Sequence, residues 1–146
     1  MVAQAVTLTC EKSAVLHNEQ AHLARRLLDR GYATPITIEQ LSQEVALSPY
    51  YLIRLFRRIY KQTPHQYLTQ LRISRAKELL SNSDLSITEI CADVGFESLG
   101  SFSALFCKIV GIPPSAYRRS SQTIRKSVCI PLCACLLHGI RDPLDQ

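Results

Sequence analysis

The chain has 146 residues, a formal net charge of +5 and a sequence pI near 9.0. This length accommodates one domain of ordinary size with tails and excludes two large domains. The basic balance favours a polyanionic partner, although the total charge alone does not identify one. No apolar run reaches the roughly 18 residues that a membrane span requires, and the N-terminus lacks the features of a signal peptide. We therefore expect a cytoplasmic protein with no membrane partner.

Six cysteines lie at positions 10, 91, 107, 129, 133 and 135 and form no spaced disulfide framework. Cys129, Cys133, Cys135 and His138 place four possible metal ligands within ten residues, but their spacing differs from that of the usual paired zinc ligands. We prefer an apolar tail to a metal site and expect no cofactor. The G-x-S-x-G, H-E-x-x-H and P-loop patterns do not occur, so we do not expect an enzyme.

Residues 1–18 lack strong periodicity and are expected to form a loosely ordered arm. A first helix is predicted from about Glu19 to Arg30, where an apolar stripe of leucines precedes a glycine stop. Thr37 and Gln40 then have the spacing of a capping box, which predicts a short helix over residues 37–45.

The next predicted helix follows Ser48, a good N-cap, and begins with Pro49 at its first position. One face is apolar and is expected to pack on a core. Its residues are Leu52, Leu55, Phe56 and Ile59. The other face combines an aromatic, an aliphatic and several guanidinium side chains without acidic partners at i,i+4. These are Tyr50, Ile53, Arg54, Arg57 and Arg58. This outward face is suited to an anionic partner rather than being an ordinary solvated surface, which would mix both signs of charge.

A long helix is predicted over residues 64–81, ended by a polar break. Ser86 and Glu89 repeat the capping box and predict another short helix. A further helix begins near Ser98. Its buried positions are predicted to be Phe102, Leu105, Phe106 and Ile109.

The short helix over residues 37–45 and the helix that follows Ser48 form one unit. The short helix that begins at Ser86 and the helix that begins near Ser98 form a second copy of this unit. Ile38 and Val45 match Ile87 and Val94 at a shift of 49, and one extra residue in the second turn then makes the shift 50. At this shift, Leu55-Phe56, Ile59, Pro64 and Tyr67 match Leu105-Phe106, Ile109, Pro114 and Tyr117. Chance repetition of apolar residues would not preserve the caps, the turn, the proline and the tyrosine in order. Each copy has the organisation of a helix-turn-helix unit, whose second helix reads the major groove.

The expected fold is therefore all-α, with two helix-turn-helix lobes joined by a long linker helix within residues 19–120. About seven helices are expected, including a last short one over residues 115–120, and residues 121–146 form a Cys-rich apolar tail. If the linker helix is rigid, the two reading helices can enter successive major grooves roughly 34 Å apart. One chain could then bind a non-palindromic site as a monomer.

Basic residues concentrate in the first copy. No acidic residue occurs between Glu44 and Glu78, and seven Arg and Lys residues lie there. They are Arg54, Arg57, Arg58, Lys61, Arg72, Arg75 and Lys77. In the second copy, Ala104 and Cys107 occupy the positions of Arg54 and Arg57. The second reading helix is still expected to face DNA, through Leu99, Gly100, Ser103, Ala104 and Lys108.

Several spaced motifs carry a family resemblance. They are Leu47-Ser48-Pro49-Tyr50-Tyr51-Leu52-x-Arg54-x-Phe56-Arg57, Thr63-Pro64-x-x-Tyr67, Leu71-Arg72-x-x-x-Ala76-x-x-Leu79-Leu80 and Val94-Gly95-Phe96-x-Ser98-x-x-x-Phe102, ending in Pro113-Pro114-x-x-Tyr117-Arg118. Through them, residues 19–120 resemble the DNA-binding domain of the arabinose-operon activator (AraC/XylS) family of bacterial regulators. The resemblance implies a seven-helix, two-lobed domain that binds double-stranded promoter DNA and usually activates transcription by contacting RNA polymerase.

Two departures from the family pattern stand out. The family commonly has basic residues at the positions of Ala104 and Cys107, and most members carry a sensor domain, for which 18 N-terminal residues are too few. The chain therefore resembles the short stand-alone members or is a fragment. A protein-interaction module that has lost DNA binding in its second lobe is the alternative. Added salt should weaken phosphate-based DNA binding steeply and leave a hydrophobic docking surface nearly unaffected.

Overall fold

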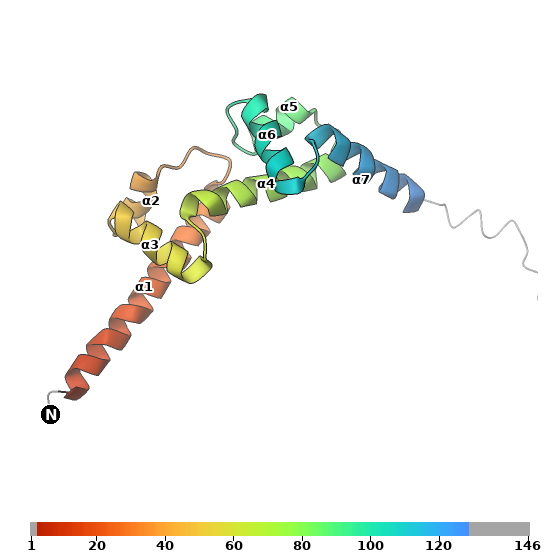
Figure 1. Ribbon diagram of the computed structural model, residues 1–146. Helices are drawn as coiled ribbons and strands as arrows, with labels where there is room; N and C mark the ends of the chain where they lie inside the picture. Colours follow the sequence, from red (N-terminus) through yellow and green to blue (C-terminus); the bar gives the residue numbers. More distant parts are fainter. Residues whose placement is uncertain (1–2, 129–146) are drawn as a thin grey trace, which may run out of the picture.

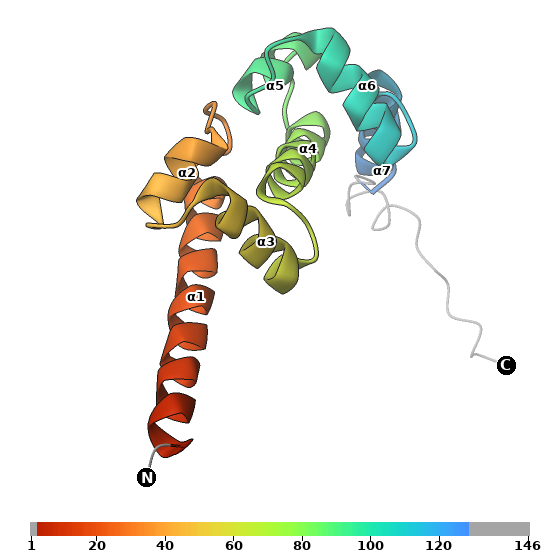
Figure 2. The same cartoon turned by 60° about the vertical axis from the view of Figure 1, so that its left-hand side comes forward.

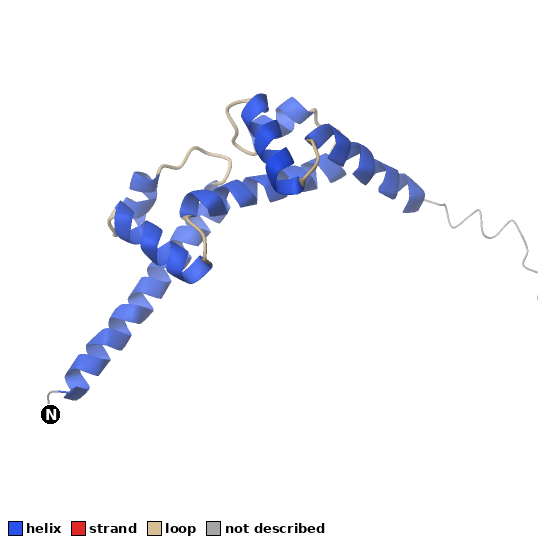
Figure 3. Ribbon diagram, in the orientation of Figure 1, coloured by secondary structure: helices blue, strands red, loops and turns tan. Residues whose placement is uncertain are grey.

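The computed structural model describes the backbone of residues 3–128 and the side chains of residues 16–123 (Figure 1). Seven helices and no strands occur in this part of the chain (Figure 3), as the all-α prediction requires. The helices are α1 (Ala3–Gly31), α2 (Ile38–Glu44), α3 (Pro49–Tyr60), α4 (Pro64–Asn82), α5 (Ile87–Asp93), α6 (Leu99–Val110) and α7 (Pro114–Val128). Figures 1 and 2 show α4 running between a first lobe of α1, α2 and α3 and a second lobe of α5, α6 and α7.

Both ends of the described chain are more helical than the sequence predicted. α1 begins at Ala3 instead of near Glu19, so most of the segment expected to be a loosely ordered arm is helical. α7 continues to Val128 instead of ending near Ser120. Neither extension contains a glycine or a proline, so no residue there ends the helix. Residues 129–146, which include most of the predicted Cys-rich tail, lie outside the described residues.

The predicted caps begin the short helices of both copies. In α2, Thr37 Oγ1 accepts a hydrogen bond from Gln40 N at 3.2 Å, and Gln40 Oε1 accepts one from Thr37 N at 3.0 Å. In α5, Ser86 Oγ accepts from Glu89 N at 3.2 Å, and Glu89 Oε2 accepts from Ser86 N at 2.6 Å. These bonds satisfy N–H groups that have no partner within the helix. A third capping box, which the sequence reasoning missed, begins α4 at Thr63.

Each lobe has its own hydrophobic core. The first core consists of Ala24, Leu28, Leu41, Val45, Leu52, Phe56 and Leu68. The second consists of Ile73, Ala76, Leu80, Ile90, Cys91, Val94, Phe102 and Phe106. Phe56 and Phe106, which the repeat predicts to be equivalent, are both 0% exposed. α4 contributes to both cores and is the element on which the two lobes are built.

Not every predicted buried position is buried. Ile109, expected in the second core, is 46% exposed, whereas its counterpart Ile59 is half-buried. The first lobe packs α1 directly against α3, while α6 packs against α5 and α7. The two lobes therefore cover the same position of the repeat differently. On α4, Leu71 is half-buried and Ile73 is buried.

Among the described residues, no single helix is long and apolar enough to cross a membrane. Taken together, α6 and the start of α7 have the length and apolar composition of a membrane span, but the two segments are bent by 58° relative to each other.

The first prediction concerns the two phenylalanines. Phe56→Ala and Phe106→Ala should each lower the free energy of unfolding by about 3–5 kcal/mol, because each leaves a cavity in a closed core. Urea denaturation followed by circular dichroism measures this change. Ile112→Ala is the control, since this side chain is 40% exposed. A phenylalanine variant as stable as the wild type would show that the two positions are not equivalent.

The second prediction concerns the matched capping boxes. Hydrogen bonds from the side chain and backbone of Ser86 lower the pKa of the Glu89 carboxyl below its ordinary value of 4.5. The ionised cap therefore stabilises the fold above that value and loses its contribution as the pH falls through the lowered pKa. Glu89→Gln should remove this part of the acid dependence, and Gln40→Glu should add it to the first lobe. Denaturation curves between about pH 6 and pH 3 test both variants, and profiles parallel to that of the wild type would contradict the assignment.

Candidate nucleic-acid interface

The helix α3 is positioned by local chemistry at its start. Ser48 Oγ accepts a hydrogen bond from Tyr51 N at 3.3 Å, and Pro49 occupies the first helical position, as predicted. The preceding turn is closed by Leu47 N, which donates to Ser42 O at 2.9 Å. Leu52, Leu55 and Phe56 are buried and attach α3 to the first lobe. This attachment determines which face of α3 is left for a partner.

The outward face of α3 carries the predicted cationic and aromatic residues. Tyr50 is 72% exposed, and Arg54, Arg57 and Arg58 are exposed as well. The Arg54 guanidinium lies over the Tyr50 ring, 5.6 Å from its centroid, in a cation–π arrangement. Among the described residues, none of the three arginines forms an ion pair. The face therefore presents a cluster of unneutralised guanidinium groups, one of them oriented by an aromatic ring.

Ile53 differs from its neighbours on this face. It is half-buried and lines an apolar cavity of about 410 Å³ together with core residues such as Leu41 and Leu68. The helical spacing alone had placed it outward with Tyr50 and Arg54. Its side chain lies at the boundary between the core and the surface, so only part of it is available for contact.

The basic residues of α4 do not join the cluster on α3. Arg72 Nε donates to Tyr32 O at 2.7 Å, and its Nη2 donates to Thr34 O at 3.1 Å. Burial lowers the pKa of this guanidinium. Arg75 forms an ion pair with Glu78 at 2.9 Å. The Lys77 ammonium lies over the Tyr117 ring, 5.7 Å from its centroid. The sequence count of seven cations thus overstated the number available to an external anion.

The equivalent surface of α6 is present but weakly charged. Ser98 begins the helix by accepting a hydrogen bond from Ser101 N at 3.2 Å. The predicted contact residues Leu99, Gly100, Ala104 and Lys108 are exposed, and Ser103 is half-buried. Exposed Cys107 takes the place of Arg57. Lys108 is the single cation on this face, and three acidic residues of the same lobe are exposed. They are Glu89, Asp93 and Glu97.

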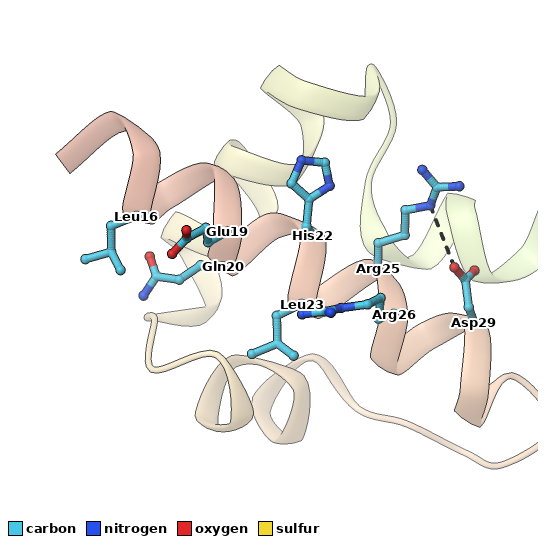
Figure 4. A pocket seen from close by; sticks show the side chains of 8 residues that line it. All are labelled: Leu16, Glu19, Gln20, His22, Leu23, Arg25, Arg26 and Asp29. Atoms are coloured by element: carbon cyan, nitrogen blue, oxygen red, sulfur yellow. Dashed lines mark ion pairs between the residues drawn. The ribbon is translucent and has the colours of Figure 1, made fainter. Parts of the chain in front are cut away.

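Polar side chains along α1 attach this helix to α3 and α4. A hollow of about 780 Å³ lies along this helix. Figure 4 shows the side chains that line it: Leu16, Glu19, Gln20, His22, Leu23, Arg25, Arg26 and Asp29. His22 Nδ1 and the Tyr60 hydroxyl are 2.8 Å apart, and the Tyr67 hydroxyl donates to Asp29 at 2.6 Å. Burial and the bond to Asp29 raise the pKa of Tyr67. These groups are engaged in packing α1 on α3 and α4, an attachment that the sequence did not reveal.

Two cysteines lie between residues 16 and 123, one buried and one exposed. Cys91 and Cys107 are both free, and burial raises the pKa of Cys91. Between residues 16 and 123, no group of three or more His, Cys, Asp or Glu side chains is arranged to hold a metal ion. The possible ligands from Cys129 to His138 lie outside the described residues.

Two capped helix-turn-helix units on a shared helix, one with an exposed cationic reading helix, define a tandem helix-turn-helix DNA-binding domain. A family described as "Helix-turn-helix domain" matches residues 41–120. The melibiose operon regulatory protein of Escherichia coli K12 is 32% identical over 123 residues, which cover 83% of this chain and 41% of that protein. The chain spans less than half the length of the curated relatives it matches.

Two solved structures are similar to this chain. The C-terminal domain of AraT, a response regulator from Geobacillus stearothermophilus, matches with a TM-score of 0.67 and 30% identity, over 69% of this chain and 84% of that chain. The DNA-binding domain of the global transcriptional factor AdpA, solved with a target DNA, matches with a TM-score of 0.68 and 27% identity, over 73% of this chain and 96% of that chain. The chain belongs to the AraC family of helix-turn-helix transcription regulators.

Proposed function

We propose that this chain binds double-stranded promoter DNA in a sequence-specific manner and regulates transcription, with α3 as the principal reading helix. The observation that carries the proposal is the exposed cluster of guanidinium groups on α3, which has no acidic counterpart among the described residues. The similarity to a domain solved with its target DNA supports it. Because bacterial promoters lie in the cytoplasm, the chain acts there.

Some side chains of α3 contact the bases and others contact the phosphates. Arg54 reaches a guanine edge, since a guanidinium can donate two hydrogen bonds to guanine O6 and N7. Tyr50 and the exposed part of Ile53 contact thymine methyl groups beside it. Arg57 and Arg58 contact phosphates, which position the helix without reading sequence.

The second reading helix, α6, contributes less binding affinity than α3. Leu99, Gly100, Ser103, Ala104 and Lys108 face a neighbouring major groove. One cation on this helix gives little electrostatic affinity, and the exposed acids of the lobe oppose the approach of phosphate. One chain covers both half-sites as a monomer and activates transcription through contact with RNA polymerase.

An interaction with another protein through the second lobe is a second candidate. Three large apolar side chains of this lobe are exposed: Leu99 at 41%, Ile109 at 46% and Ile112 at 40%. Such residues favour contact with a polypeptide more than contact with phosphate. Salt titration separates the candidates, because only phosphate-based binding falls steeply with added salt.

The third prediction tests direct readout by α3. On a duplex that the wild type selects from random DNA, Arg54→Ala should cost about 1–3 kcal/mol and flatten the preference at one base position. Arg58→Ala is the comparison, and its loss should be similar on all sequences. Binding titrations on the selected duplex and on random DNA measure both. Equal losses on the two DNAs for Arg54→Ala would assign this residue to a phosphate.

The fourth prediction tests the weakness of the second lobe. The wild type should select one well-specified half-site and one degenerate half-site about one helical turn away. Ala104→Arg with Cys107→Lys should steepen the salt dependence of binding by about one unit of slope for each new phosphate contact. Asn82→Arg adds a charge at the end of α4, away from α6 in sequence, and is the control. Two wild-type half-sites of equal information content would contradict the proposed asymmetry.

A further inference from the structure

Two loops from different lobes meet beside α4. Figures 1 and 2 show the loop between α1 and α2 reaching toward the turn between α5 and α6. A Cβ atom built on Gly95 would lie 2.5 Å from Ala33 O and 2.9 Å from Ala33 C, so the two backbones touch at this point. No larger residue fits at position 95 unless the loop moves.

Arg72 joins the same two loops from the middle of α4. Its guanidinium donates to Tyr32 O and Thr34 O of the first lobe, at 2.7 and 3.1 Å. The same group lies over the Phe96 ring of the second lobe, 5.7 Å from its centroid. One side chain of the linker helix therefore contacts both lobes. We call the group formed by Tyr32, Ala33, Thr34, Arg72, Gly95 and Phe96 the interlobe clasp.

Each side of the interlobe clasp is anchored in a core. Tyr32 packs against the first core, and Phe96 packs against the second. The Phe96 ring is 5.3 Å from that of Phe102, which is fully buried. A movement of either loop would therefore disturb packing inside its lobe. This anchoring makes the clasp a mechanical link between the two cores.

The internal repeat shows why position 95 is a glycine. Ala46 is the equivalent residue of the first lobe, and it adopts a positive φ of 53°. Gly95 has a φ of 84°. The turn therefore accepts an alanine at its left-handed position when the side chain is exposed, as the side chain of Ala46 is. The additional demand at position 95 is the close approach to Ala33, which leaves no room for a Cβ atom.

We infer that the interlobe clasp fixes the angle between the two lobes and thereby sets the spacing of the two DNA half-sites that one chain accepts. The second part of this inference rests on the proposed function. α4 has 19 residues and is about 28 Å long, so bending within it would shift one reading helix against the other. A second contact beside the helix axis opposes such bending. Because successive base pairs rotate around the duplex, a fixed angle between the lobes selects one spacing.

The experiment uses the full chain with two variants that open the clasp. Gly95→Ala inserts a Cβ between the loops, and Arg72→Met, which has no hydrogen-bond donor, removes the bonds to the loop of the first lobe. Ala46→Gly changes the equivalent turn in the first lobe and is the matched control. Spin labels attached by non-cysteine chemistry at exposed Glu44 and Thr88 report the distance between the lobes without DNA. Circular dichroism monitors folding, and Arg72→Met decides the result if Gly95→Ala does not fold.

We expect a narrow distance distribution for the wild type and Ala46→Gly, and a broad or shifted one for the two clasp variants. On the duplex selected by the wild type, inserting two base pairs between the half-sites should weaken wild-type binding about fivefold, a modest loss because the second lobe makes few contacts. The clasp variants should bind the original spacing less tightly and lose less than about twofold on insertion.

The outcomes separate the two proposals. Unchanged distance distributions in both clasp variants would overturn the inference, as would a wild-type dependence on spacing that both variants retain. A wild type that enriches no sequence from random DNA would instead overturn the proposed function.

Discussion

The helix α4 supplies buried side chains to two cores, and the rest of the structure depends on this shared use. Leu68 belongs to the first core, while Ile73, Ala76 and Leu80 belong to the second. The short helices α2 and α5 have seven residues each and would not form alone, because helices of that length are unstable in water. Their caps specify where they begin, but packing against longer helices holds them in place.

The two lobes use one scaffold for different surface chemistry. Their caps and central phenylalanines correspond, so the two reading helices start from equivalent turns. The exposed face of α3 carries guanidinium groups, whereas the exposed residues of α6 are small residues, the apolar Leu99 and Ile109, and one lysine. Such a division is physically economical, since one strongly contacting helix can hold the domain on DNA. In the proposed function, the other helix adds a weaker contact at a distance that the interlobe clasp defines.

A defined distance requires more than a helical linker. Arg72 illustrates the point, because it lies in the acid-free basic stretch and by charge alone belongs with the residues proposed to contact DNA. Its hydrogen bonds to Tyr32 and Thr34 and its position over Phe96 instead place it between the lobes. The chain thus uses a cation for architecture where backbone carbonyls converge, and leaves the arginines of α3 for an external anion.

The sequence by itself determined the starts of α2, α3, α5 and α6, the repeat and the face of α3 that carries Tyr50 and Arg54. These features depend on local hydrogen bonds and helical periodicity, which residues a few positions apart specify. Only the tertiary structure decided the exposure of Ile109, the partial burial of Ile53 and the engagement of Arg72. Those outcomes depend on which distant segment covers a given side chain, and spacing along one helix contains no information about that.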